Sequence, residues 1–192
     1  MHDLLLAAQT WWDAQRFDQP EWQVAAWRDQ KVRHIHLHVT KALGKVVAML
    51  DEAGPLASDS ACVVRVRCEV LPDVAIYRSQ LINLLRARWA LPSSLSHADP
   101  DVGAQADDTL WRVTLGLSRA SAALATYLEP REHGASSCAS HLIRAIEQLH
   151  ACATTLAAWF RDYLAHLHLA RLEALLGASI PALSTDQGDA DR

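Results

Sequence analysis

The sequence has little glycine, little proline and few aromatic residues other than tryptophan. Of its 192 residues, 7 are Gly, 7 are Pro, 2 are Phe and 3 are Tyr. So few turn-forming residues exclude a turn-rich β-sandwich and a low-complexity chain. Alanine and leucine, by contrast, number 33 and 28, and both favour helices. With 51% hydrophobic residues, the chain can bury a sizeable core. We therefore expect an all-α globular protein.

Positive charge and long apolar runs are also missing. The net charge is −4, which argues against a partner of duplex nucleic acid, because such binders need an excess of Lys and Arg. No apolar run approaches the roughly 20 residues of a membrane-spanning helix. The first residues lack the basic and apolar regions of a signal peptide. The four cysteines contain no C-x-x-C pair, so we expect reduced thiols in a cytoplasmic protein without a membrane partner.

Pro, Gly and Ser clusters divide the chain into five segments. Pro72 is expected either to kink the second helix of the first hairpin or to mark its true start. Glu129-Pro130 and Gly134 are expected to end the helix that runs from about 108 to 128, and a break is expected near His166. The fifth helix is predicted to run from about 136 to 176. The predicted segments are an N-terminal helix (1–19), a helical hairpin (20–91), a linker (92–107), a second hairpin (108–183) and a disordered tail (184–192).

The two hairpins resemble each other at an offset of 74 residues. Between Val39 and Leu50, five of twelve positions are identical to the residue 74 places later. Chance similarity between two Ala- and Leu-rich helices is the alternative explanation. A repeated hairpin can bury its apolar faces against its copy. We therefore predict a four-helix bundle built from two repeated hairpins, with an additional N-terminal helix.

Two polar stripes stand out on the first hairpin. One consists of basic side chains spaced by four, three and four residues, so that they share a helix face. The other is mainly acidic and has spacings of four, four and three. An antiparallel hairpin would place the two stripes opposite each other, either as a cleft for an anionic ligand or as solvated faces that contribute little. The basic stripe is His34, His38, Lys41 and Lys45; the acidic one is Glu69, Asp73, Tyr77 and Gln80.

These stripes lie within motifs that resemble a known family. Residues 69–77, with the sequence EVLPDVAIY, look like the E-E-L-A-D-V-L-I-Y helix of MazG-like all-α nucleotide pyrophosphohydrolases. Residues 38–46, with the sequence HVTKALGKV, resemble the K-L-x-E-E-x-G-E-L helix that precedes it. The resemblance covers about residues 31–90, with a weaker echo in 108–176. It implies a helical bundle that splits nucleoside triphosphates into monophosphate and pyrophosphate.

Family members hold Mg²⁺ on an E-x-x-E…E-x-x-D set of carboxylates, because hard cations need oxygen ligands. In this sequence Lys41, Ala42 and Lys45 stand where the first acids belong, and Val70 replaces one acid of the second motif. Glu69 and Asp73 remain, and the resemblance implies that they are the metal ligands and catalytic acids. The lysines would then supply positive charge to a phosphate. In the family the two hairpins usually come from two subunits, whereas here one chain could supply both; a homodimer stays open.

Two functions follow as hypotheses. The first is binding of a nucleotide or another phosphate ligand by His34, His38, Lys41, Lys45 and Tyr77, with pyrophosphohydrolysis and Mg²⁺ if the protein is catalytic. The second is a non-catalytic helical interaction or regulatory protein that keeps only the fold. A histidine-based metal site is a third alternative, since His34 and His38 can converge on a helix.

Overall fold

The structure of the protein is a computed structural model, which describes residues 2–17, 25–51, 61–86, 106–160 and 164–176. Every regular element in these ranges is helical, and they contain no strand. None of the described helices is long and apolar enough to cross a membrane. The expected all-α class is confirmed. The predicted tail and most of the predicted linker lie outside the described residues.

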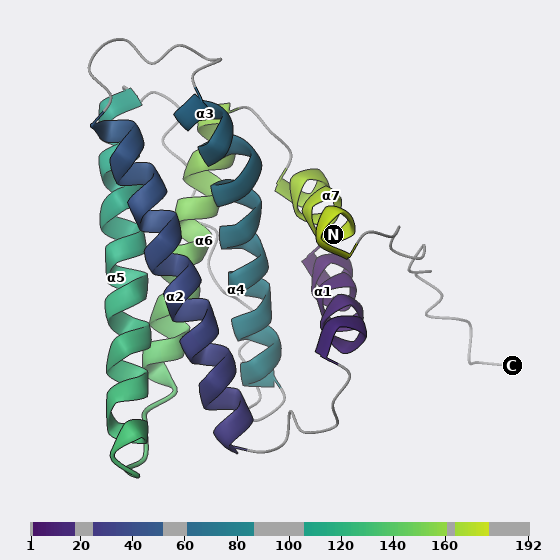
Figure 1. The fold of residues 1–192 in the computed structure, drawn as a ribbon, viewed down its shortest axis with the longest axis vertical. Helices are drawn as coiled ribbons and strands as arrows, with labels where there is room; N and C mark the ends of the chain where they lie inside the picture. Colours follow the sequence, from purple (N-terminus) through teal and green to yellow (C-terminus); the bar gives the residue numbers. More distant parts are fainter. Residues whose placement is uncertain (1, 18–24, 52–60, 87–105, 161–163, 177–192) are drawn as a thin grey trace, which may run out of the picture.

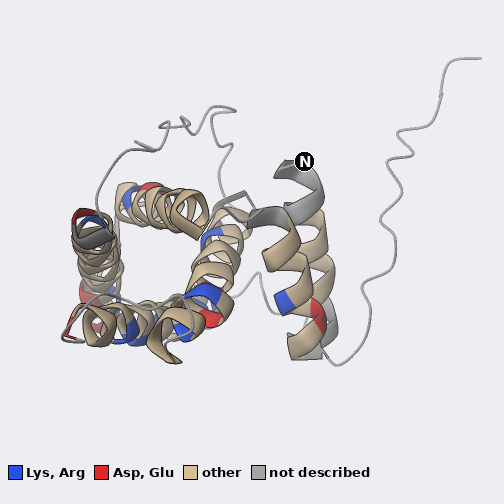
Figure 2. Cartoon of the chain, turned by 90° about the horizontal axis from the view of Figure 1, so that it is seen from above, with Lys and Arg blue, Asp and Glu red and all other residues tan. Residues whose placement is uncertain are grey.

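Four long helices stand side by side around a common core. Their bounds are α2 Ala25–Leu50, α4 Leu71–Arg86, α5 Ala106–Glu132 and α6 Ser140–Phe160. Helix α2 contacts α4 and α5, and α6 contacts the same two helices from the opposite side. Seen from above, the four helices occupy the corners of a square (Figure 2). Neighbours around this square run in opposite directions (Figure 1).

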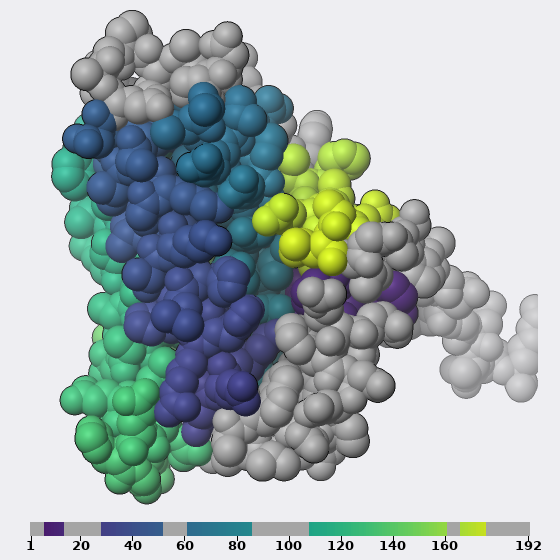
Figure 3. Space-filling model, in the orientation of Figure 1, coloured from purple at the N-terminus to yellow at the C-terminus, as the bar shows by residue number. Residues whose placement is uncertain are grey.

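Two further helices lie outside the square. Helix α1, His2–Phe17, and helix α7, Leu164–Leu176, contact each other and α4. In the space-filling view, the purple and yellow surfaces of this pair lie against the blue surface of the bundle (Figure 3). The segment predicted as a helix over 136–176 with a break near His166 contains two helices, α6 from Ser140 to Phe160 and α7 from Leu164 to Leu176.

The apolar positions of the two stripe-bearing helices form the core, as their helical spacing predicts. Of nine apolar positions with this spacing, seven are less than 2% exposed, and the other two, Leu43 and Leu50, are partly buried against the core. Helix α6 contributes a continuous apolar face that runs from Leu142 to Ala157. The seven are Ile35, Val39, Val46, Leu71, Val74, Leu81 and Leu85.

The predicted disturbance at Pro72 takes the form of a wider helical turn. A short helix α3, Ala61–Arg65, runs into a π-helical turn, Val66–Val70, which continues directly into α4. The amide of Leu71 donates to the carbonyl of Val66, five residues earlier. Pro72 has no amide proton, and its ring crowds the carbonyl four residues back, so a local change of the hydrogen-bonding pattern is expected before it.

Of the residues predicted to end this helix, Pro130 does not end α5, whereas Gly134 does. The helix continues to Glu132, with Pro130 in its last turn. Termination comes at Gly134, whose φ of 73° lies in the left-handed region. The amide of Ala135 donates to the carbonyl of Pro130, and that of Gly134 to Arg131, which is a Schellman cap. The proline is tolerated because the carbonyl four residues earlier belongs to the exposed Thr126, where water can replace the lost amide. At its other end, α5 begins at Ala106, two residues inside the predicted linker.

Gly116 allows close contact between α5 and α6, which yields a stability prediction. A β-carbon at Gly116 would overlap Sγ of the buried Cys152. Gly116→Ala is expected to destabilise the protein by about 1–2 kcal/mol, because overpacking outweighs the gain in helix propensity. Urea unfolding measures the change. The matched control is Gly44→Ala, where an added β-carbon meets nothing within 4 Å and about 1 kcal/mol of stabilisation is expected. Equal effects of the two substitutions would contradict the prediction.

Candidate functional site

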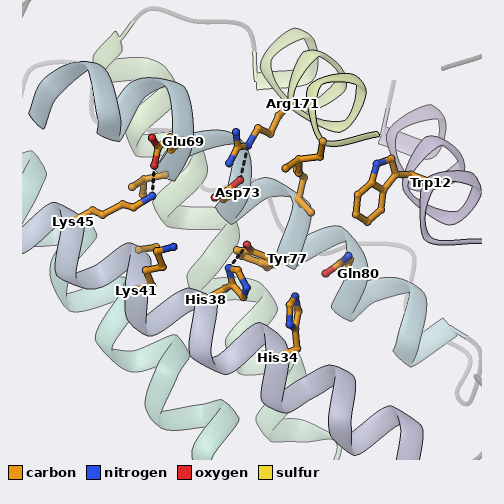
Figure 4. A pocket seen from close by; sticks show the side chains of 14 residues that line it. Trp12, His34, His38, Lys41, Lys45, Glu69, Asp73, Tyr77, Gln80 and Arg171 are labelled. Atoms are coloured by element: carbon orange, nitrogen blue, oxygen red, sulfur yellow. Dashed lines mark hydrogen bonds and ion pairs between the residues drawn. The ribbon is translucent and has the colours of Figure 1, made fainter. Parts of the chain in front are cut away.

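A cavity of about 380 Å³ lies between α2 and α4 and is closed on one side by α1 and α7 (Figure 4). The seven side chains predicted from the sequence to bind a ligand or a metal all line this cavity. Three lining side chains come from the outer helices, namely Trp12, Arg171 and Leu175. The remaining lining residues are Ala42, Val70, Ile76 and Gln80.

The basic wall of the cavity is one face of α2. Four residues at helical spacing project from it, because α2 is regular over its whole length and positions three or four apart lie above one another. Lys41 is exposed and has no ion pair with any described residue, whereas the Lys45 side chain is 17% exposed. The imidazoles of His34 and His38 lie in contact, with ring centroids 4.4 Å apart.

The opposite wall carries the two carboxylates, and each is paired with a cation. Lys45 donates from Nζ to Oε2 of Glu69, which confirms that the two stripes face each other at this point. The Glu69 side chain is 40% exposed, and the bond from Lys45 lowers its pKa below the usual range. Asp73 accepts from Nε of Arg171 at 2.9 Å. The charged end of the cavity therefore contains three cationic side chains and two carboxylates.

The middle of the cavity is held by a hydrogen bond between His38 and Tyr77. The Tyr77 hydroxyl lies 2.8 Å from Nδ1 of His38. Burial raises the pKa of Tyr77 above its ordinary value, so the phenol keeps its proton. Burial also lowers the pKa of His38, and the charges of Lys41 and Lys45 act in the same direction despite the opposing effect of Asp73. Tyr77 therefore donates to a neutral imidazole.

The inner end of the cavity rests on a buried polar network. Oδ1 of Asp13 accepts from Nε2 of Gln80 at 2.9 Å and from Nε2 of Gln9 at 3.2 Å, and Nζ of Lys31 lies 3.5 Å away. The amide oxygen of Gln9 lies 3.1 Å from Nε2 of His168. Asp13 and Lys31 are 2% and 4% exposed, so this is a buried ion pair. It fixes Gln80 beside Trp12, whose indole donates to the carbonyl of Leu172.

The donor set does not fit Mg²⁺ well. Glu69 and Asp73 are the two carboxylates of the cavity, and both are occupied by cationic partners. Within the described parts of the chain, no three His, Cys, Asp or Glu side chains converge as a metal site would require. The pair His34 and His38 likewise lacks a third ligand there. A hard cation needs several oxygen ligands, and here lysine nitrogens stand in their place.

Sequence reasoning missed the contribution of the outer helices. Arg171 was not selected, although it is the one Arg or Lys in a helix rich in Leu and Ala, and a single basic residue on such a helix is a usable signal. Trp12 offered no such signal, because tryptophan at helical spacing is more often a core residue. Asp13 and Lys31 lie 18 residues apart on different helices, and their pairing depends on tertiary packing.

Comparison with protein families, with curated proteins and with solved structures found no match for this chain.

Proposed function

We propose that the cavity between α2 and α4 binds a small phosphate-bearing molecule, with a nucleotide as the ligand implied by the MazG-like resemblance. The observation that carries this proposal is the charge pattern of the cavity. Lys41, Lys45 and Arg171 gather at one end, and two carboxylates partly balance them. With the histidines neutral, one positive charge is in excess before any ligand arrives.

The arrangement of the ion pairs explains how a phosphate could enter. Oxygen atoms of a phosphate offer the same kind of acceptor as the Glu69 carboxylate, with more charge to share among the lysines. The ligand would therefore displace the Glu69 side chain, which is more exposed to solvent than that of its partner Lys45. It would then contact Lys41 and Lys45. Arg171 can add a forked contact from the opposite wall.

The inner end of the cavity suits the organic part of such a ligand. The rings of His34, Tyr77 and Trp12 line it, and the amide of Gln80 is held by Asp13. Flat apolar surfaces with a few fixed polar groups are typical of sites that bind small organic molecules. A ligand with an anionic end and a ring at the other end matches both halves of the cavity.

Lys41→Ala is expected to weaken binding of a nucleoside triphosphate by about tenfold, the equivalent of 1.4 kcal/mol for one lost charged contact. Glu69→Gln is expected to strengthen binding, because Lys45 is released from its competitor. Isothermal titration calorimetry without Mg²⁺ measures both effects. Arg33→Ala is the matched control, because Arg33 is a basic residue of α2 that pairs with Glu132 outside the cavity.

The catalytic form of the proposal predicts the opposite order of effects for these two substitutions. If Glu69 and Asp73 hold Mg²⁺ for pyrophosphohydrolysis, Glu69→Gln abolishes metal-dependent binding and turnover, and Lys41→Ala has the smaller effect. Nucleotides that bind neither with nor without Mg²⁺ would instead favour the non-catalytic interaction protein. A thermal-shift panel separates these outcomes, since a ligand at about a hundred times its dissociation constant adds about 2.7 kcal/mol.

We also propose that the hairpins formed by α2 with α4 and by α5 with α6 are copies of one ancestral unit. Arg119 stands 74 residues after Lys45, the same offset that aligns the two sequences.

All lining residues of the cavity between α2 and α4 come from one chain, so its formation needs no second subunit. Light scattering tests whether the protein is a homodimer. Four free cysteines support the cytoplasmic location that we propose.

A further inference from the structure

A second cavity, of about 300 Å³, lies between α5 and α6. Its wall on α5 is formed by residues spaced three, one and three apart, and its wall on α6 by residues spaced three and four apart, so each wall is one helix face. The lining residues are Arg119, Ala122, Ala123 and Thr126 from α5, and His141, Arg144 and Gln148 from α6.

The lining of this second cavity is basic and contains no carboxylate. Arg119 and Arg144 approach it from different helices, and neither forms an ion pair or a hydrogen bond with another residue in the described ranges. The imidazole of His141 and the amide of Gln148 add further donors. This differs from the first cavity, where each carboxylate is held by a cation.

Small side chains leave room for a ligand between the two arginines. Ala122 and Ala123 form the α5 wall at this level, and the Thr126 hydroxyl donates to the carbonyl of Ala122 at 2.8 Å. That bond ties the threonine to its own helix, so it does not fill the space. Two guanidinium forks across a cavity with small walls match the oxygen atoms of a tetrahedral dianion.

We propose that the cavity between α5 and α6 is a second anion site, which binds the phosphate group of a small molecule through Arg119 and Arg144. It is separate from the first cavity, because the two share no lining residue. An anion enters it without displacing an internal ion pair. The second hairpin therefore has a ligand of its own and is more than a structural support for the first.

The test is a titration of the full-length protein with inorganic phosphate at pH 8 and constant ionic strength, followed by backbone amide NMR. Saturable shifts are expected for residues 119–126 and 141–148. The double variant Arg119→Gln/Arg144→Gln is expected to weaken this binding at least tenfold, whereas Arg112→Gln, on the same helix outside the cavity, leaves it unchanged.

Lys41→Ala separates this site from the first one. It is expected to leave phosphate binding at 119–126 and 141–148 intact, whether or not the first cavity proves to bind nucleotides. Shifts that do not saturate, that chloride reproduces at equal ionic strength, or that survive the double arginine variant would overturn the proposal. Amide spectra of the free variants show whether the fold is kept.

Discussion

Replacing Lys31 with methionine is expected to destabilise the protein by about 3–5 kcal/mol at neutral pH. Lys31 and Asp13 are almost fully buried, and Nζ lies 3.5 Å from Oδ1 of Asp13. Methionine has a similar volume but no charge, so the Asp13 carboxylate would stay buried with only amide donors. Typical domains are stable by 5–15 kcal/mol, and a loss of this size would be seen directly in urea unfolding.

The second substitution Asp13→Asn distinguishes a charge effect from a packing effect. In Lys31→Met/Asp13→Asn both charges are gone, and the asparagine oxygen can still accept from Gln9 and Gln80. Most of the lost stability is expected to return, because burial opposes the charged forms of both residues, raising the pKa of Asp13 and lowering that of Lys31. A double variant as unstable as Lys31→Met alone would show that the charge pair is not the cause.

Acidification from pH 7.5 to pH 5 is expected to cost about 2 kcal/mol of stability through His168 alone. Burial, aided by the charge of Arg78, lowers the pKa of this histidine to about 4, against an ordinary value near 6.5. Between those two values the unfolded chain binds the proton and the folded chain does not, so stability falls as the pH drops from about 6.5 towards 4. Above pH 6.5 the group contributes no dependence, and below about pH 4 the loss is complete, at about 3 kcal/mol.

His168→Gln is the variant that isolates this effect. Gln9 donates from its amide nitrogen to Asp13, so its oxygen faces His168, and Nε2 of the histidine carries the proton of that bond. A glutamine nitrogen can replace this donor. The difference in stability between wild type and variant should shrink by about 2 kcal/mol from pH 7.5 to pH 5, as measured by urea unfolding at each pH. A constant difference would mean that His168 binds its proton equally readily in the folded and the unfolded protein.

The helical class and the core were predictable because they depend on local properties. Residues such as Ile35, Val39 and Val46 recur at helical spacing. A helix with an apolar stripe of that period is stable in water when the stripe is buried against other elements. Helix ends were less predictable. The stop predicted at Pro130 came too early, because a proline can be accommodated in the last turn of a helix where the carbonyl that loses its partner reaches water.

The candidate site was predictable only where it lies on a single hairpin. Helical spacing placed Lys45 opposite Glu69, because both stripes follow from the phase of neighbouring helices. Asp73 was expected to face the basic stripe as well, yet its partner is Arg171, 98 residues away in sequence. How α7 packs on α4 depends on the whole outer pair of helices, and no local pattern encodes that position.

The outer pair of helices also determines when the first cavity can form during folding. The bond from Trp12 to Leu172 spans 160 residues and that from Arg171 to Asp73 spans 98, whereas α5 and α6 are neighbours in the chain. Closing long loops costs more entropy than pairing adjacent helices, so contacts of high sequence separation form late. During synthesis, the chain must extend beyond Leu172 before Trp12 can meet its partner. In refolding, we therefore expect ligand affinity to return after helix content, since the wall that carries Arg171 is assembled last.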